Sequence, residues 1–227
     1  DMQKSIVNRY PQFTDKSSVV IENISEINRF QNIKDKIDLE NITGFKPRFS
    51  VLYAGTFGKV NGIDRVIDLA QKTLIIDNRL VYILIGAGAE KENVIQLAKN
   101  TGVYGKNVFI LDSISKNELP KWYNTVSMGS SFVIDIKELW ANSANKFFDT
   151  LAAGKPILIN HEGWQAEIIR DYNIGYVLPS IVTTEDASSF VKYTLNDSLI
   201  NEQQIKALAG AKEKYSLERA VEKYTDV

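Results

Sequence analysis

The stretch that decides the fold is FSVLYAGTFGKVNGIDRVIDLA, residues 49–70. Its first six residues, Phe49–Ala54, form a continuous apolar run that predicts a buried strand. Glycine ends this run at Gly55, and after Gly62 the apolar residues recur at the spacing of one helical face. A buried strand, a glycine-rich turn and an amphipathic helix predict the first unit of a parallel α/β sheet.

The same alternation continues toward the C-terminus. Further strands are expected at Leu80–Ile85, Val108–Leu111, Ser131–Ile134, Pro156–Asn160 and Gly175–Leu178, and helices between them at Glu90–Asn100, Lys116–Asn124, Asn145–Ala153 and Trp164–Asp171. Three closing helices are expected at Thr184–Leu195, Leu199–Ala209 and Ser216–Tyr224. This pattern predicts an α/β protein with a Rossmann-like, doubly wound parallel sheet and closing C-terminal helices. Its core is expected at about Ser50–Leu178.

The region before the first buried strand has a weaker pattern. A short polar helix is expected at Met2–Tyr10, ended by Pro11, and a short β-branched strand at Ser18–Glu22. Asn23–Pro47 is polar and has no strong period, so we expect it to be a connection.

Composition narrows the class of protein. The 227 residues are 44% hydrophobic and 24% charged, as in ordinary globular domains, and the net charge of -1 does not favour nucleic acid as a partner. There is no cysteine and one histidine, His161, which excludes disulfides, zinc–thiolate sites, thiol nucleophiles and histidine-rich metal sites.

A cysteine-free chain fits a reducing cytoplasm. No apolar run approaches the ~20 residues that span a bilayer, and no signal peptide opens the chain. The start, Asp-Met-Gln, fits an excised segment.

Ligands of open α/β sheets bind beyond the carboxyl ends of the strands, where helix N-termini present free N–H groups. An anion is therefore the expected ligand. The loops in this position are Gly55–Gly62, Gly86–Glu90, Asp112–Ser115, Asp135–Asn145 and Asn160–Trp164.

The first of these loops is a candidate phosphate loop. Its spacing, G-x-x-G-x-x-x-G from Gly55 to Gly62, matches neither the dinucleotide fingerprint nor the P-loop, and Lys59 adds a positive charge. The alternative interpretation is a tight turn between strand and helix. The second loop, Gly86-Ala-Gly88, is a weaker candidate of the same kind.

The densest candidate segment is DIKELWANSANKFFD, residues 135–149. Asn142 or Ser143 is expected to cap the following helix, leaving free amides that suit a diphosphate. Lys146 adds charge, and Asp149 lies one turn from Asn145 and Lys146, so its carboxylate can accept hydrogen bonds from a diol such as ribose. The alternative is a solvated helix start.

Other polar and aromatic residues are assigned ordinary roles. His161 is interpreted as a loop residue rather than a catalytic one. The aromatic residues expected in the core are Phe147, Phe148, Tyr172 and Tyr176, and the residues expected to be solvated helix charges are Lys116, Glu118 and Lys121.

Four segments in order resemble a known family. VLYAGTFGKVNGIDRVIDLA, LVYILIGAGAEKENVIQLAKNTGV, NVFILDSISKNELPKWY and NSANKFFDTLAAGKPILIN resemble the C-terminal, nucleotide-sugar-binding domain of retaining GT-B glycosyltransferases. The resemblance is to the group 1, glycogen-synthase-like enzymes of bacterial surface-polysaccharide type, from about residue 19 to the end, and residues 145–156 are its most specific part. It implies that residues 1–47 are the end of the acceptor domain and the interdomain linker, and that 48–227 bind the donor.

The resemblance also implies an activity. Joined to its missing N-terminal acceptor-binding half, the chain is expected to be a hexosyltransferase that transfers a sugar from a UDP- or GDP-sugar to an acceptor hydroxyl with retention. The fragment alone is expected to be inactive. No metal or other cofactor is expected, because helix dipoles and basic side chains stabilise the departing diphosphate. The expected location is the cytoplasm, with room for peripheral association of the full-length enzyme with the inner face of the membrane.

Particular residues take roles from the resemblance. The resemblance implies that Asp149 takes the place of the second glutamate of the family's paired-glutamate motif, which holds the ribose. It also implies that the backbone of Ser113–Ser115 borders the base and that Asn142–Asn145 lies against the diphosphate and sugar. No catalytic residue and no metal ligand is assigned. The candidate donor-binding residues are Gly55, Thr56, Gly58, Lys59, Asn61, Gly86, Ser113, Ile114, Asn142, Ser143, Asn145, Lys146 and Asp149.

The sequence departs from the family pattern at two places. The first glutamate of the pair falls near Ala141, with Glu138 out of register. The usual arginine and lysine of the first loop fall near Thr56 and Asn61, so the positive charge is expected either from Lys59 or from elsewhere, including Lys146.

Two rival functions stay open at this point. One is a sugar-nucleotide epimerase of the same fold, which needs carboxylates and histidines facing the cleft. The other is a non-catalytic nucleotide-binding or scaffolding module. An oxidoreductase is disfavoured because the G-x-G-x-x-G fingerprint is absent.

Overall fold

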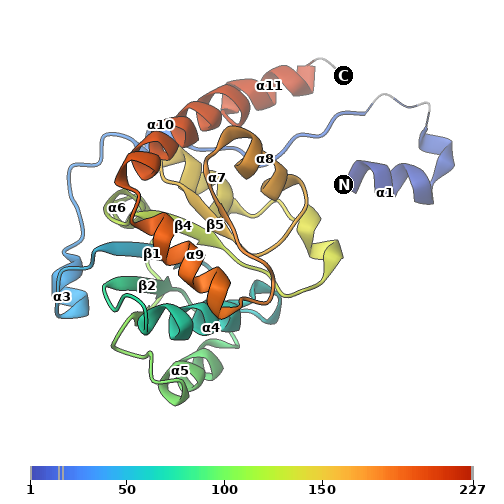
Figure 1. The fold of residues 1–227 in the computed structure, drawn as a ribbon. Helices are drawn as coiled ribbons and strands as arrows, with labels where there is room; N and C mark the ends of the chain where they lie inside the picture. The colour runs from blue at the N-terminus through green and yellow to red at the C-terminus, as the bar shows by residue number, and fades with distance from the viewer. Residues whose placement is uncertain (1, 15, 17, 226–227) are drawn as a thin grey trace.

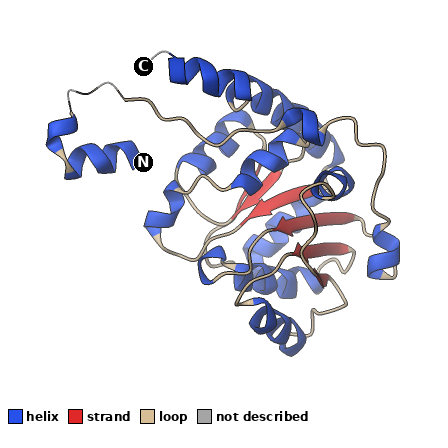
Figure 2. Ribbon diagram, turned by 180° about the vertical axis from the view of Figure 1, so that it is seen from behind, coloured by secondary structure: helices blue, strands red, loops and turns tan. Residues whose placement is uncertain are grey.

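The computed structural model describes residues 2–14, 16 and 18–225, and it contains a six-stranded sheet covered by helices on both faces (Figures 1 and 2). The strands are β1 (Phe49–Ala54), β2 (Leu80–Ile85), β3 (Val108–Leu111), β4 (Met128–Ser131), β5 (Ile157–Ile159) and β6 (Gly175–Val177). Their order is β3-β2-β1-β4-β5-β6, and all neighbouring pairs are parallel. The predicted doubly wound parallel sheet is therefore confirmed.

The helices that connect these strands are close to those predicted after Phe49. The α-helices are α1 (Met2–Arg9), α2 (Ile27–Phe30), α3 (Leu39–Thr43), α4 (Ile63–Leu74), α5 (Lys91–Asn100), α6 (Leu119–Thr125), α7 (Asn145–Ala152), α8 (Trp164–Tyr172), α9 (Thr184–Thr194), α10 (Asp197–Lys214) and α11 (Leu217–Thr225). Three short 3-10 helices are η1 (Pro11–Phe13), η2 (Lys59–Asn61) and η3 (Lys137–Ala141). The helix predicted from Lys116 begins three residues later, at Leu119, with Pro120 in its first turn, where a missing N–H costs nothing.

Alternation along the strands distributes the core over the two faces. Val51 and Tyr53 of β1 pack in one buried cluster with residues of α4 and α9, whereas Leu52, between them, packs with Tyr123 of α6 and Ala152 of α7. Both faces of β1 and β2 are covered, which explains why these strands are continuous apolar runs.

The strand predicted at Ser131–Ile134 was wrong, because β4 is Met128–Ser131. Its sequence, MGSS, is short of apolar residues because α7 lies close against it: a methyl group at Gly129 would overlap the Thr150 side chain. Beyond Ser131 the chain leaves the ladder, since the Asn160 side chain bonds both the N–H and the carbonyl of Val133, at 2.9 and 2.8 Å.

The strand predicted at Ser18–Glu22 was also wrong, because this stretch is extended chain without a strand partner among the described residues. Val19, Val20 and Ile21 are 42%, 45% and 41% exposed, so the β-branched run faces solvent instead of a sheet. Figures 1 and 2 agree that α1, just before it, stands apart from the sheet and its helices.

The predicted connection at residues 23–47 contains two short helices and is fixed to α7. The Asn23 amide donates to the Ser143 carbonyl at 2.6 Å, the Ser25 hydroxyl to the Phe148 carbonyl at 3.0 Å, and the Gln31 amide to the Ala152 carbonyl at 2.7 Å. These bonds reach the start, middle and end of α7, so residues 23–31 are part of the folded domain. We call residues 23–29 the linker segment.

Candidate functional site

The site is a cleft at the carboxyl ends of β1, β2 and β3, beside the point between β1 and β4 where the strand order reverses and open α/β sheets bind their ligands. Two adjoining cavities of about 340 and 820 Å³ form it. Both are lined by Ala54, Gly55, Thr56, Lys116 and Leu119, so they open into one another.

The first loop enters the cleft through its beginning only. Thr56 is held there by its carbonyl oxygen, which accepts hydrogen bonds from the Tyr53 hydroxyl at 2.7 Å and from the Asn61 amide at 2.6 Å. The candidates Gly58, Lys59 and Asn61 do not line either cavity, and Lys59 is exposed. The loop turns away after Thr56 into η2, so Asn61 supports the loop's shape rather than the cleft's surface.

The smaller cavity is mostly apolar. Its walls include Ile85 and Leu119 together with three more candidates, Gly86, Ser113 and Ile114. A methyl group at Gly86 would overlap the carbonyl oxygen of Gly55, so the ends of β1 and β2 approach this closely only because residue 86 is glycine. Apolar walls with backbone groups at the rim suit a flat ring such as a nucleotide base.

The larger cavity is bounded by the start of α7. The remaining candidates, Asn142, Ser143, Asn145, Lys146 and Asp149, all line it. The prediction that Asn142 or Ser143 caps the helix was wrong: the capping position is Ala144, which has no side chain to accept from the first amides. The first turn of α7 thus lacks a side-chain cap and faces the cavity with the positive end of its dipole.

Lys146 brings its charge to the first loop. Its Nζ lies 3.1 Å from where a methyl group at Gly55 would stand, and 5.0 Å from the centre of the Tyr53 ring. Burial is the main influence on the Lys146 amine and lowers its pKa, while Asp149 raises it. Lys146, rather than Lys59, is the cation beside the Gly55–Thr56 backbone.

Asp149 is a half-buried carboxylate on the cleft wall. Burial raises its pKa to about 6, and the nearby charge of Arg29 opposes this rise more than Lys146 or Lys116 does, while Glu26 adds to it. Within the described residues no donor hydrogen-bonds to this carboxylate. Its oxygens are therefore available to a ligand that supplies hydroxyl groups.

Sequence reasoning missed one wall of the larger cavity, which the linker segment supplies through Asn23, Ile24, Glu26 and Arg29. Lys116 is exposed, as expected of a solvated charge, but it precedes α6 instead of lying on it, and it lines both cavities. The order of residues along the chain gives no sign that positions about 120 apart form one cavity. The one local signal was Phe30, an apolar residue in a polar stretch, which is fully buried beside Arg29.

Several other residues lie away from the cleft. His161 is buried and its Nδ1 lies 2.8 Å from the Glu162 carbonyl, so no histidine lines either cavity. Glu138 is exposed on η3 and does not replace the carboxylate missing at Ala141. Phe147 and Phe148 are core residues as predicted, but Tyr172 is 38% exposed on α8, which corrects its assignment to the core.

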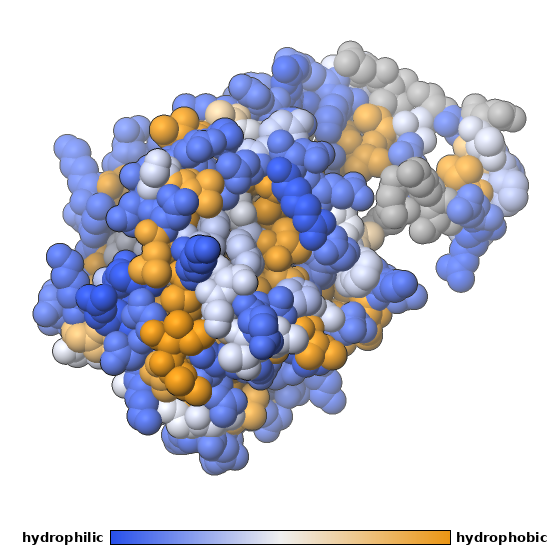
Figure 3. All heavy atoms as spheres, viewed as in Figure 1, coloured by the Kyte–Doolittle hydropathy of each residue, from blue (hydrophilic) through white to orange (hydrophobic). Residues whose placement is uncertain are grey.

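The described part of the chain lacks two further features. Among residues 2–14, 16 and 18–225, no group of three or more histidine, cysteine, aspartate or glutamate side chains is arranged to hold a metal ion. No helix in these ranges is both long and apolar enough to cross a membrane. On the face in Figure 3, apolar residues form separate small groups among hydrophilic ones.

Comparison with known sequences identifies relatives. The sequence profile described as "Glycosyl transferases group 1" matches residues 35–212. The putative colanic acid biosynthesis glycosyl transferase WcaI of Escherichia coli K12 is 26% identical over 156 residues, which are 64% of this chain and 35% of that protein. The chain thus spans about a third of the length of this curated relative.

Comparison with solved structures agrees on the fold. WaaG, a glycosyltransferase involved in lipopolysaccharide biosynthesis, superposes with a TM-score of 0.73 at 18% identity, over 98% of this chain and 59% of that one. The C-terminal domain of LpcC from Francisella tularensis gives 0.67 at 17% identity, over 84% and 98% of the two chains. HepE from Anabaena, whose structure contains UDP and glucose, gives 0.69 at 15% identity, over 92% and 56%.

Proposed function

We propose, because this chain belongs to the glycosyl transferases group 1 family, that its cleft binds the nucleotide-sugar donor of a sugar-transfer reaction. The smaller, apolar cavity takes the base. The larger cavity takes the ribose and the diphosphate, with Asp149 accepting the ribose hydroxyls and the Gly55–Thr56 backbone, the start of α7 and Lys146 meeting the phosphates.

One observation carries this proposal: three features that suit three parts of a donor share a single opening. An apolar slot, an uncapped helix start with a lysine beside it, and a carboxylate without a donor all adjoin Gly55 and Thr56. Each feature alone is common in proteins, but together in one cleft they suit the base, the diphosphate and the ribose of a single nucleotide.

The finer features of the reaction are proposals of the same kind. The donor is a UDP- or GDP-sugar, the transferred group is a hexosyl unit, and the anomeric configuration is retained. The uncapped start of α7 and Lys146 stabilise the departing diphosphate without a metal ion. HepE and the pneumococcal transferase GtfA have been solved with UDP and a sugar, which supports a uridine nucleotide as the first ligand to try.

The biological setting is likewise proposed. The names of WcaI and WaaG support a role in polysaccharide or glycoconjugate biosynthesis. We further propose that the full-length enzyme works on the cytoplasmic side of the membrane, with peripheral association. We propose that residues 1–47 end an acceptor domain and lead into the donor domain of residues 48–227. Acceptor binding then needs a further domain, and the 227-residue chain alone binds donor without turnover.

Calorimetry of the 227-residue chain with UDP, GDP, UDP-glucose and GDP-mannose tests the proposal. We expect one nucleotide series to bind, equally well with EDTA or with Mg²⁺, and Asp149→Ala to weaken its binding about 10- to 100-fold through loss of charge-assisted hydrogen bonds. Asp171→Ala, at an exposed aspartate on α8, is the matched control and should leave affinity unchanged.

Two results would contradict the proposal. Absence of binding to every nucleotide would favour the scaffolding alternative. Equal affinity of wild type and Asp149→Ala would remove the assignment of the ribose to this cavity.

A further inference from the structure

The linker segment spans the larger cavity and bonds to both of its sides. At one side, the Asn23 amide donates to the Ser143 carbonyl at 2.6 Å and to the Asn145 side chain at 2.8 Å. At the other side, the Arg29 guanidinium donates to the Lys116 carbonyl. The segment is therefore a structural wall of the cleft, and its polar side chains are held in place before any ligand arrives.

The Arg29 side chain of this wall is held by three contacts. One nitrogen of its guanidinium lies 2.8 Å from the Glu26 carboxylate, a second bonds the Lys116 carbonyl, and the group lies 5.6 Å from the centre of the buried Phe30 ring. A guanidinium has five N–H donors in a planar fork, so these two bonds leave three donors for a ligand.

Charge makes Arg29 decisive for an anionic ligand. The charged residues that line the larger cavity are three cations, Arg29, Lys116 and Lys146, and two carboxylates, Glu26 and Asp149. With Arg29 the lining has an excess of one positive charge, and without it the charges cancel. Without Arg29, a diphosphate would enter a cavity lined by equal numbers of positive and negative charges. The free-energy cost of removing the phosphate charges from water would then be offset less by charge-assisted hydrogen bonds.

Glu26 does not disable Arg29 as an anion ligand. Its side chain is 52% exposed, against 27% for Arg29, so the carboxylate can turn to solvent while the arginine stays in the wall. Such an exposed pair contributes little stability, and exchanging it for a phosphate costs correspondingly little.

We propose that Arg29 of the linker segment is a donor-binding residue that contacts a phosphate of the nucleotide sugar. This inference rests on the proposed function, and it adds a ligand contact from outside the strand-end loops. The guanidinium of Arg29 supplies a planar fork of N–H donors, which neither the first loop nor Lys146 has. The donor is bound between α7 and the linker segment.

Calorimetry with a nucleoside and its diphosphate tests the contact. For Arg29→Gln we expect about 10- to 30-fold weaker binding of UDP and unchanged binding of uridine, or the same split with GDP and guanosine if that series binds. Arg29→Lys keeps the charge but loses the fork, so we expect an intermediate loss. Thermal unfolding of both variants identifies any loss of folded protein.

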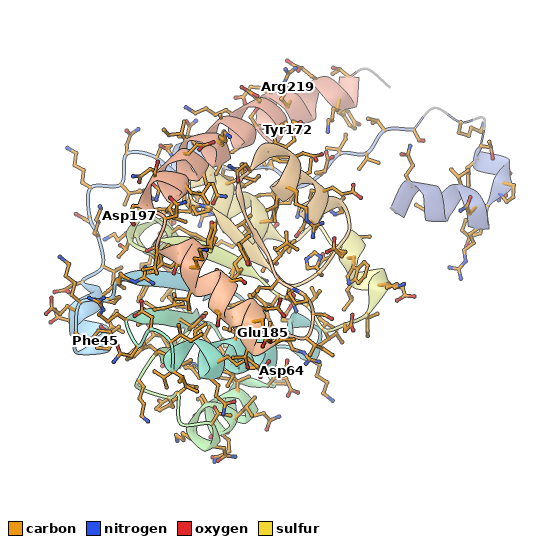
Figure 4. The ribbon with its side chains drawn as sticks, viewed as in Figure 1. Phe45, Asp64, Tyr172, Glu185, Asp197 and Arg219 are labelled. Atoms are coloured by element: carbon orange, nitrogen blue, oxygen red, sulfur yellow. The ribbon has the colours of Figure 1, made fainter. Side chains whose placement is uncertain are left out.

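Arg219→Gln is the matched control, because Arg219 forms the same kind of pair, 2.6 Å from Glu222 and three residues apart in sequence. Arg219 lies on α11, where Figure 4 labels it, and lines neither cavity, so its variant should bind UDP like wild type.

The outcomes separate this inference from the function on which it rests. No nucleotide bound by wild type overturns the proposed function. Wild-type binding with UDP affinity unchanged in Arg29→Gln overturns the phosphate contact alone. Equal weakening of UDP and uridine also overturns it, since Arg29 would then act through Asp149 on the ribose.

Discussion

The two cavities of the cleft are built from different material. The smaller one is formed mainly by backbone and apolar side chains at the ends of β1, β2 and β3, whereas the larger one is lined mainly by charged and polar side chains of α7 and the linker segment, and Lys116 borders both. The sheet's hydrogen bonds fix the first, and contacts between segments about 120 residues apart assemble the second. We therefore expect the smaller cavity to be sensitive to changes in volume and the larger one to changes in charge.

The largest effect is expected from adding one methyl group at the rim of the smaller cavity. Gly86→Ala places a methyl group against the Gly55 carbonyl and should destabilise the domain by about 2–4 kcal/mol and abolish nucleotide binding. Chemical denaturation and calorimetry measure the two effects. Gly210→Ala, where the new methyl group meets nothing within 4 Å inside α10, is the control and should be neutral or slightly stabilising. Normal stability of Gly86→Ala would show that the strand ends can separate.

The next largest effect is expected from charge in the larger cavity, as a dependence of the free energy of unfolding on pH. The Asp149 pKa of about 6 lies above the ~3.9 of an unfolded aspartate, so the folded state holds this proton more tightly. Ionised Asp149 therefore costs stability above about pH 6, and this cost disappears as the pH falls to about 4. Asp149→Asn should raise the unfolding free energy by about 1–3 kcal/mol at pH 7–8 and by little at pH 4.

Urea denaturation of both proteins at several pH values measures this difference, with Asp171→Asn as control. A gain that does not change between pH 4 and pH 8 would mean that Asp149 is not held in a surrounding that disfavours its charge. Nucleotide affinity should run the other way and fall below pH 6, because a protonated carboxyl accepts fewer hydrogen bonds from ribose.

A smaller effect is expected at Lys146, and it should be confined to phosphate. Lys146→Gln should weaken nucleoside diphosphate binding about 10-fold and leave nucleoside binding unchanged, because Nζ lies beside the Gly55–Thr56 backbone. Lys99→Gln is the matched control, since Lys99 lies over Tyr104 at 5.4 Å much as Lys146 lies over Tyr53 at 5.0 Å. Weaker nucleoside binding in Lys146→Gln would place the lysine nearer the base or ribose.

The smallest effect is expected at Lys59, the cation that the sequence offers first. Because Lys59 is exposed and outside both cavities, Lys59→Gln should change nucleotide affinity less than about twofold, or ~0.4 kcal/mol. Titration of this variant at low ionic strength is the most demanding measurement, since screening is then weakest. A 10-fold loss of nucleotide affinity would mean that the phosphate contacts the second half of the first loop.

Much of the fold could be predicted because strands and helices leave periodic patterns. Phe49–Ala54 and Leu80–Ile85 were predicted with the bounds that the structure has, since strands buried on both faces are unbroken apolar runs. The strand β4 was misplaced for the opposite reason. Gly129 is there for the approach of Thr150, and that requirement is visible only once α7 is in position.

The candidate site was predictable where it follows strand ends and unpredictable where it does not. Gly55, Thr56, Gly86, Ser113, Ile114, Asn142, Ser143, Asn145, Lys146 and Asp149 line the cleft, because the carboxyl ends of parallel strands meet at one edge. Gly58, Lys59 and Asn61 do not, since the direction of a loop after its first residues depends on bonds such as that from Asn61 to the Thr56 carbonyl.

By itself, the sequence determined the parallel sheet, the edge where a ligand belongs and the helix that carries Asp149. These follow from local periodicity and from rules common to such sheets. Only the tertiary structure decided which cations enter the cleft, because a charged side chain has no preferred side until its neighbours are packed. Arg29 faces the cavity since buried Phe30 and the bonds of Asn23, Ser25 and Gln31 bind residues 23–31 to α7.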